Sequence, residues 1–135
     1  MKKRSLTNVS LFLFLSIALF SSHSFIYAED AKPFLGTWNG AISVMGMEIE
    51  ITVKFSLDET KAITGTIDVP MQGATDLNLR DIKIEGKKIS FMIDDPGVPG
   101  DPTFKGELDE TGKKITGTFA QGGTEGTFSI EKEEK

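Results

Sequence analysis

Polar and apolar side chains alternate along most of this chain, and this pattern constrains its fold more than any other feature. From Met47 to Leu57, every odd-numbered residue is apolar and every even-numbered residue is polar. A period of two is typical of a β-strand that buries one face and exposes the other. The spacing of three and four that predicts a long helix is not sustained anywhere. Seven further runs alternate in the same way: Gly36–Val44, Ala62–Val69, Leu77–Ile84, Lys88–Ile93, Thr103–Leu108, Lys114–Ala120 and Gly126–Glu131.

The connections between these runs are short and rich in turn-forming residues, which predicts antiparallel pairing of sequential strands. Such a meander either closes into a barrel or folds over as a sandwich. Several glycines, including Gly40, Gly65 and Gly117, share the parity of the apolar residues in their strands. Because an inward position without a side chain lets a strand coil sharply, these glycines favour the barrel. We therefore predict an all-β, eight-stranded antiparallel meander barrel.

Two irregularities interrupt the alternation. The segment from Asp94 to Pro102 contains three prolines, which cannot donate hydrogen bonds to a ladder, so we expect a long loop there. The apolar parity also slips near Arg80 and Asp81, which predicts a β-bulge. In addition, the stretch from Leu57 to Ile67 recurs with one extra residue from Leu108 to Phe119. The chain is therefore expected to form two related halves of four strands.

The first 28 residues have the layout of a secretory signal peptide. A basic start precedes an apolar run from Leu11 to Phe20, and Ala28 offers a small residue for cleavage. The apolar run is about half the ~20 residues of a membrane-spanning helix, which disfavours the rival interpretation of a retained anchor. We expect residues 1–28 to be removed and residues 29–135 to form one barrel domain in a secreted or periplasmic protein without a stable membrane anchor.

Charge and composition exclude several classes of function. Loss of Lys2, Lys3 and Arg4 would take the formal net charge from −5 to −8. This charge argues against nucleic acid and anionic membrane surfaces as partners. The absence of cysteine excludes disulfides, thiol nucleophiles and thiolate metal sites. The single histidine, His23, lies in the segment expected to be removed.

Catalytic chemistry is not predicted for the remaining chain. A serine nucleophile needs a base, and the four serines after the signal segment share the parity of the polar face, without a histidine. Paired carboxylates could in principle cleave glycosides, and the aspartates near Pro96 could in principle hold Ca²⁺. Carboxylates in turns and loops more commonly just face solvent. We therefore predict a non-enzyme with no catalytic residue, no metal and no cofactor.

The inward aromatic residues either fill the barrel or line a cavity for a ligand. Trp38, which lies between Gly36 and Gly40, is expected to be a structural anchor of the core together with the inward glycines. The candidate ligand-binding residues lie at turns and strand ends, with the two methionines at the first hairpin, where they contact either a ligand or the core. They are Met45, Met47, Asp68, Gln72 and Gln121. Methionines can contact an apolar ligand, and the two glutamines, equivalent in the half-repeats, can bond the loop backbone or a ligand.

The segment Gly36-Thr37-Trp38-Asn39-Gly40 resembles the Gly-x-Trp opening of lipocalin-like barrels. More specifically, the chain is similar to a small exported bacterial domain that often precedes the α/β-hydrolase domain of secreted serine hydrolases. The similarity rests on Gly65–Ala74, Ile84–Phe91 and Ile115–Gly123 and covers nearly the whole chain after the signal segment.

This resemblance implies a lipocalin- or streptavidin-like barrel and an exported location, and it carries over no catalytic residue. Two departures from the pattern matter. No hydrolase domain is present in the sequence. Lipocalins also pack a late arginine over the tryptophan, whereas Arg80 is the only arginine after the signal segment.

Three functions fit these observations. The first is an exported binding or accessory module that holds a small apolar or extended ligand or docks to a partner. The second is an accessory domain that acts in trans with a separately encoded secreted serine hydrolase. The third is a structural or inhibitory envelope protein with a filled barrel.

Overall fold

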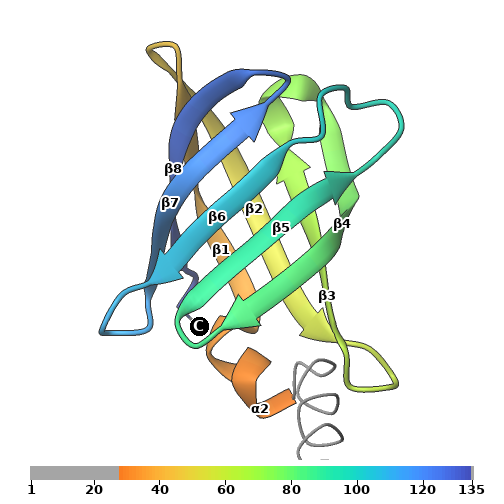
Figure 1. Ribbon diagram of the computed structural model, residues 1–135, viewed down its shortest axis with the longest axis vertical. Helices are drawn as coiled ribbons and strands as arrows, with labels where there is room; N and C mark the ends of the chain where they lie inside the picture. Colours follow the sequence, from red (N-terminus) through yellow and green to blue (C-terminus); the bar gives the residue numbers. More distant parts are fainter. Residues whose placement is uncertain (1–27, 135) are drawn as a thin grey trace, which may run out of the picture.

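The computed structural model describes residues 28–134, which form a closed barrel of eight antiparallel strands (Figure 1). Each strand pairs with its neighbours in sequence, and β1 closes the barrel against β8. This confirms the predicted meander barrel and excludes the sandwich. The expected signal peptide lies outside the described residues, apart from Ala28. The strands are β1 (Gly36–Val44), β2 (Met47–Leu57), β3 (Ile63–Val69), β4 (Ala74–Glu85), β5 (Lys88–Asp94), β6 (Thr103–Leu108), β7 (Lys114–Gln121) and β8 (Thr124–Lys132).

The strand bounds follow the alternation closely, with the largest difference at β4. This strand begins at Ala74, three residues before the first residue of the predicted run. Its pairing with β5 shifts register between Arg80 and Lys83, which confirms the predicted bulge. A second shift, between Ile67 and Val69 in the pairing of β3 with β4, was not predicted.

Between residues 28 and 134, helical structure is limited to three short segments. These are α2 (Ala28–Ala31), η2 (Lys32–Phe34) and η3 (Pro70–Gln72), the last of which connects β3 to β4. Within residues 28–134, no helix is long and apolar enough to span a membrane.

The inward glycines allow neighbouring strands to approach closely. Gly117 in β7 pairs with Gly106 in β6, and a Cβ at Gly117 would overlap the carbonyl oxygen of Lys105. A Cβ at Gly40 in β1 would likewise overlap the carbonyl oxygen of Ser129 in β8. At Gly65 an added Cβ would lie 2.8 Å from the Leu79 side chain. These positions therefore exclude larger residues, as expected of strands that coil sharply to close a small barrel.

The interior of the barrel contains a cluster of packed aromatic side chains. Phe91 and Phe104 stack with ring centroids 4.8 Å apart, and Phe128 meets Phe104 edge-on at 5.2 Å. The buried aromatic residues of the barrel and its N-terminal segment are Phe34, Trp38, Phe55, Phe91, Phe104, Phe119 and Phe128. Together with the buried aliphatic side chains they form one packed core.

Trp38 joins the core to the N-terminal segment. Its side chain is fully buried, and the indole Nε1–H donates a hydrogen bond of 2.8 Å to the carbonyl oxygen of Phe34. The Lys132 ammonium lies 5.3 Å from the centre of the indole ring and also donates to the carbonyl oxygen of Pro33 at 3.2 Å. The cation over the indole ring is therefore a lysine at the end of β8, and not Arg80, which lies in β4. Phe34 and Trp38 together close this end of the barrel.

The internal repeat appears as two equivalent turns. The Asp58 carboxylate accepts from the Thr60 hydroxyl at 2.6 Å and from the backbone N–H of Ala62 at 3.0 Å. Asp109 accepts from the Thr111 hydroxyl at 2.8 Å in the same way. In both turns the hydroxyl is the largest cause that lowers the pKa of the aspartate below its ordinary value. The repeated sequence therefore encodes a repeated Asx-type turn.

Candidate functional site at the barrel mouth

An apolar pocket of about 390 Å³ opens at the end of the barrel opposite α2, which is the upper end in Figure 1. Four connections surround it: the β1–β2 turn, η3 with its flanks, the long β5–β6 loop and the β7–β8 turn. Its lining residues are Ile42, Val44, Met45, Ile49, Val69, Gln72, Leu77, Ile93, Val98, Pro99, Gly100, Pro102, Phe119, Gln121, Gly122 and Thr124.

The floor of the pocket consists of inward side chains of the strands. Ile42, Val69, Ile93 and Phe119 are all buried and belong to the same hydrophobic cluster as the aromatic core. The Phe119 ring packs against Phe104 with centroids 5.1 Å apart, which connects the floor to the filled part of the barrel. The pocket is therefore a recess that is open at the mouth and has the core as its floor.

One wall of the pocket is the loop between β5 and β6, whose prolines prevent it from continuing the strands. Gln121 at the end of β7 donates through Nε2 to the carbonyl oxygen of Pro99 at 2.8 Å. The backbone N–H of Gly122 donates to the carbonyl oxygen of Gly100 at 2.9 Å, and Pro102 is buried. These contacts attach the loop to the neighbouring β7–β8 turn, which holds this wall in place.

The lining offers few polar side chains. Of the lining residues that the structure describes, none is charged, and the polar side chains belong to Gln72, Gln121 and Thr124. Because an ionised group would lose its hydration there without a partner of opposite charge, the recess suits an uncharged, mainly apolar group. The amides and the hydroxyl can orient a polar atom of such a group.

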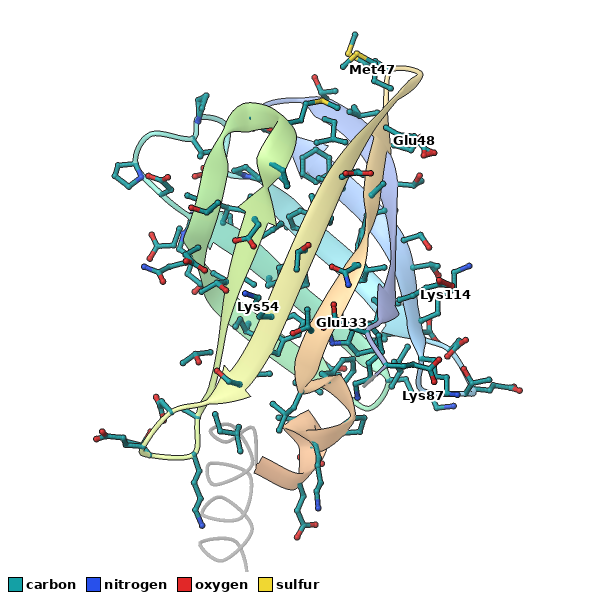
Figure 2. All side chains as sticks on the ribbon, turned by 180° about the vertical axis from the view of Figure 1, so that it is seen from behind. Met47, Glu48, Lys54, Lys87, Lys114 and Glu133 are labelled. Carbon is teal, nitrogen blue, oxygen red and sulfur yellow. The ribbon has the colours of Figure 1, made fainter. Side chains whose placement is uncertain are left out.

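The structure brings together three of the five candidate ligand-binding residues. Met45, Gln72 and Gln121 line the pocket, and Gln121 also bonds the loop backbone. Met47 lies outside the lining at the β1–β2 turn, where 58% of it is exposed (Figure 2). Asp68 also lies outside the lining, and its carboxylate accepts the backbone N–H of Asp76 at 2.7 Å.

The sequence interpretation missed several lining residues. Val98, Pro99 and Pro102 come from the loop, and a segment rich in proline and glycine gives no sign of which side chains face inward. Phe119 is one of the inward aromatic residues expected either to fill the barrel or to line a cavity, and the structure places it in the pocket floor. The alternation identifies inward side chains, but only the packed structure distinguishes the filled layers from the open one.

The loop aspartates are occupied by other partners. Arg80 contacts Asp81 at 2.8 Å, Asp101 at 3.3 Å and Asp94 at 3.9 Å. Asp95 accepts the backbone N–H of Gly97 at 3.0 Å, which stabilises the turn. Among residues 28–134, no group of three or more histidine, cysteine or acidic side chains is arranged to hold a metal ion.

Two other hollows lie on the outer surface of the barrel. One, of about 420 Å³, extends from β4 to β7 and is bordered by Lys83, Lys88, Lys105 and Glu107. The other, of similar size, crosses β1, β2 and β3 and is bordered by Thr37, Ser56 and other outward residues. Both are bordered largely by outward-facing side chains, whereas the mouth pocket is lined mainly by apolar residues that converge from all sides of the barrel.

Comparisons with known proteins add no relative. A scan against protein-family models found no match, and searches of curated proteins and of solved structures found none either.

Proposed function

We propose that this chain is an exported, non-enzymatic binding protein that holds a small apolar ligand at the mouth of its barrel. The observation that carries the proposal is the uncharged recess of about 390 Å³, closed below by the aromatic core. Its volume falls within the ~300–1,000 Å³ usual for small-molecule sites, and apolar lining with a few polar groups is typical of them. A compact recess favours a small ligand over an extended one.

Export is supported by the layout of the first 28 residues, and the non-enzymatic role by the positions of the polar side chains. Ser43, Ser56, Ser90 and Ser129 lie on strands but are not part of the pocket lining. The glutamines and Thr124 can hold a ligand by hydrogen bonds but do not take up protons near neutral pH.

The proposal can be tested with N-phenyl-1-naphthylamine, an uncharged fluorophore whose emission rises in apolar surroundings. We expect saturable binding to the purified protein. Thr124→Trp should weaken binding by roughly tenfold or more, because the indole would occupy space at the pocket wall. The control is Thr127→Trp, which places the same ring on the exposed outer face of the same strand.

Failure of the wild-type protein to bind the fluorophore would contradict the proposal. Equal weakening by the two variants would also contradict it, because binding would then take place away from the pocket. Circular dichroism of both variants verifies that the barrel is intact.

A further inference from the structure

The pocket is uncharged, but the surface around it carries charge of one sign. The four connections that form the mouth comprise residues 44–48, 68–76, 94–103 and 120–125, and none of these residues is a lysine or an arginine. We call these connections the rim. The seven carboxylates of the rim are Glu48, Asp68, Asp76, Asp94, Asp95, Asp101 and Glu125.

The opposite end of the barrel carries charges of both signs. Its turns mix acidic residues with lysines at positions 61, 87, 88, 113 and 114. Figure 2 shows this contrast: Glu48 lies at the upper end beside Met47, and Lys87 and Lys114 lie near the lower end. The excess negative charge of the folded chain is therefore concentrated around the pocket.

One cation partly offsets the rim. Arg80 forms ion pairs with Asp94 at the end of β5 and with Asp101 in the β5–β6 loop. Among the described residues, Glu48, Asp76 and Glu125 form no ion pair, and all three are exposed. They come from β2, β4 and β8, so negative charge is present on several sides of the mouth.

The rim also carries exposed apolar side chains. Met45 is 84% exposed and lines the pocket, and Met71 in η3 is 66% exposed. An incoming molecule therefore meets flexible thioethers at the opening, carboxylates around it and apolar side chains below. Carboxylates around an apolar recess attract a positive charge and repel a negative one, while the recess itself excludes both.

We propose that the pocket selects cationic amphiphiles: molecules with an uncharged apolar part that enters the recess and a positive group that stays at the rim. This inference rests on the proposed binding function and adds the charge of the ligand. At a separation of about 7 Å in water, each uncompensated carboxylate favours a cation by roughly threefold, so several together favour it by roughly tenfold or more.

The test compares three compounds with the same ten-carbon chain, namely decyltrimethylammonium, 1-decanol and decyl sulfate, each below its micelle concentration. Binding to the full mature protein is measured by NMR titration, with the methyl resonances of Met45 and Ile42 as reporters at the pocket. We expect decyltrimethylammonium to bind about tenfold more tightly than decanol, and decyl sulfate to bind more weakly than both. The advantage of the cation should shrink as salt rises from about 20 mM to about 500 mM.

A rim variant and a matched control show whether the rim carboxylates cause the preference for the cation. The combination Glu48→Gln, Asp76→Asn and Glu125→Gln should remove most of the preference for the cation and leave the affinity for decanol unchanged. The control combination Glu29→Gln, Glu59→Gln and Glu110→Gln removes the same formal charge from exposed positions away from the mouth and should preserve the preference.

The outcomes separate the two proposals. If all three compounds bind equally, or decyl sulfate binds best, the inference about ligand charge is wrong and the binding function stands. If none of them shifts the pocket resonances, the binding function itself is wrong. If the control combination abolishes the preference as fully as the rim combination, overall charge and not the rim attracts the cation, and the inference is overturned.

Discussion

Replacement of Trp38 tests the account of the core most directly. Its ring is fully buried between the strands and the N-terminal segment, and its indole N–H donates to the carbonyl oxygen of Phe34. Trp38→Ala would remove this packing and leave a cavity, at a cost of about 4 kcal/mol in the free energy of unfolding. For a domain of this size, we expect the melting temperature to fall by roughly 20 °C.

A graded series separates packing from hydrogen bonding at this position. Trp38→Phe retains an aromatic ring and loses the hydrogen bond, so it should cost about 1–2 kcal/mol. Lys132→Met removes the cation over the ring from a half-exposed site and should cost about 0.5–1 kcal/mol. Melting is followed by far-ultraviolet circular dichroism, because Trp38 is the only tryptophan in the sequence and its variants have no tryptophan fluorescence. A Trp38→Ala protein that melts within a few degrees of wild type would refute the assignment of the ring as an anchor.

Four further predictions follow from the sequence and the fold. Gly117→Ala should lower the free energy of unfolding by about 3 kcal/mol because its Cβ meets backbone. Gly97→Ala, where the Cβ would make only an ordinary contact with the Asp95 side chain at an ordinary φ, should change it by less than about 1 kcal/mol in urea titrations. The lowered pKa values of Asp58 and Asp109 stabilise the folded state above about pH 4, and this contribution is lost as the pH falls further. The double Asp→Asn variant should therefore lose less of its melting temperature than wild type between about pH 5 and pH 2. The purified protein should hydrolyse no activated ester, peptide or glycoside above background, and turnover that persists through purification would contradict this. N-terminal sequencing of the exported protein should begin at or near Glu29, and a mature chain that retains the apolar run would show that the signal peptide is misassigned.

The strands of this barrel could be predicted because period-two alternation depends on only two environments, the inside and the outside. The slip at Arg80 and Asp81 was visible for the same reason, since it moves apolar residues to the other parity. The N-terminal segment that closes the barrel could not be predicted in this way. Its contribution depends on the Phe34 ring and on hydrogen bonds that Trp38 and Lys132 donate to the backbone of the segment, and a helix of four residues has no periodicity to detect.

The candidate site was predictable to the extent that it lies in turns between recognisable strands. Met45, Gln72 and Gln121 belong to three such connections, and the structure gathers them around one pocket. Asp68 has outward parity, and its carboxylate is engaged by a backbone N–H across the β3–β4 connection. The loop wall around Pro99 depends on contacts with Gln121 at the end of β7. These residues are distant in sequence, so the composition of the loop does not predict the contact.

The seam between β1 and β8 has a consequence for how the barrel forms. All other paired strands are consecutive in sequence. Closure of the barrel requires β1 to pair with β8 from the far end of the chain, with Gly40 beside Ile130. This long closure is entropically costly and is expected to come late in folding. Until β8 docks, β1 and β7 present unpaired edges that can join the strands of other molecules. A slow or defective eighth strand should therefore lead to aggregation during folding, even where it leaves the stability of the closed barrel almost unchanged.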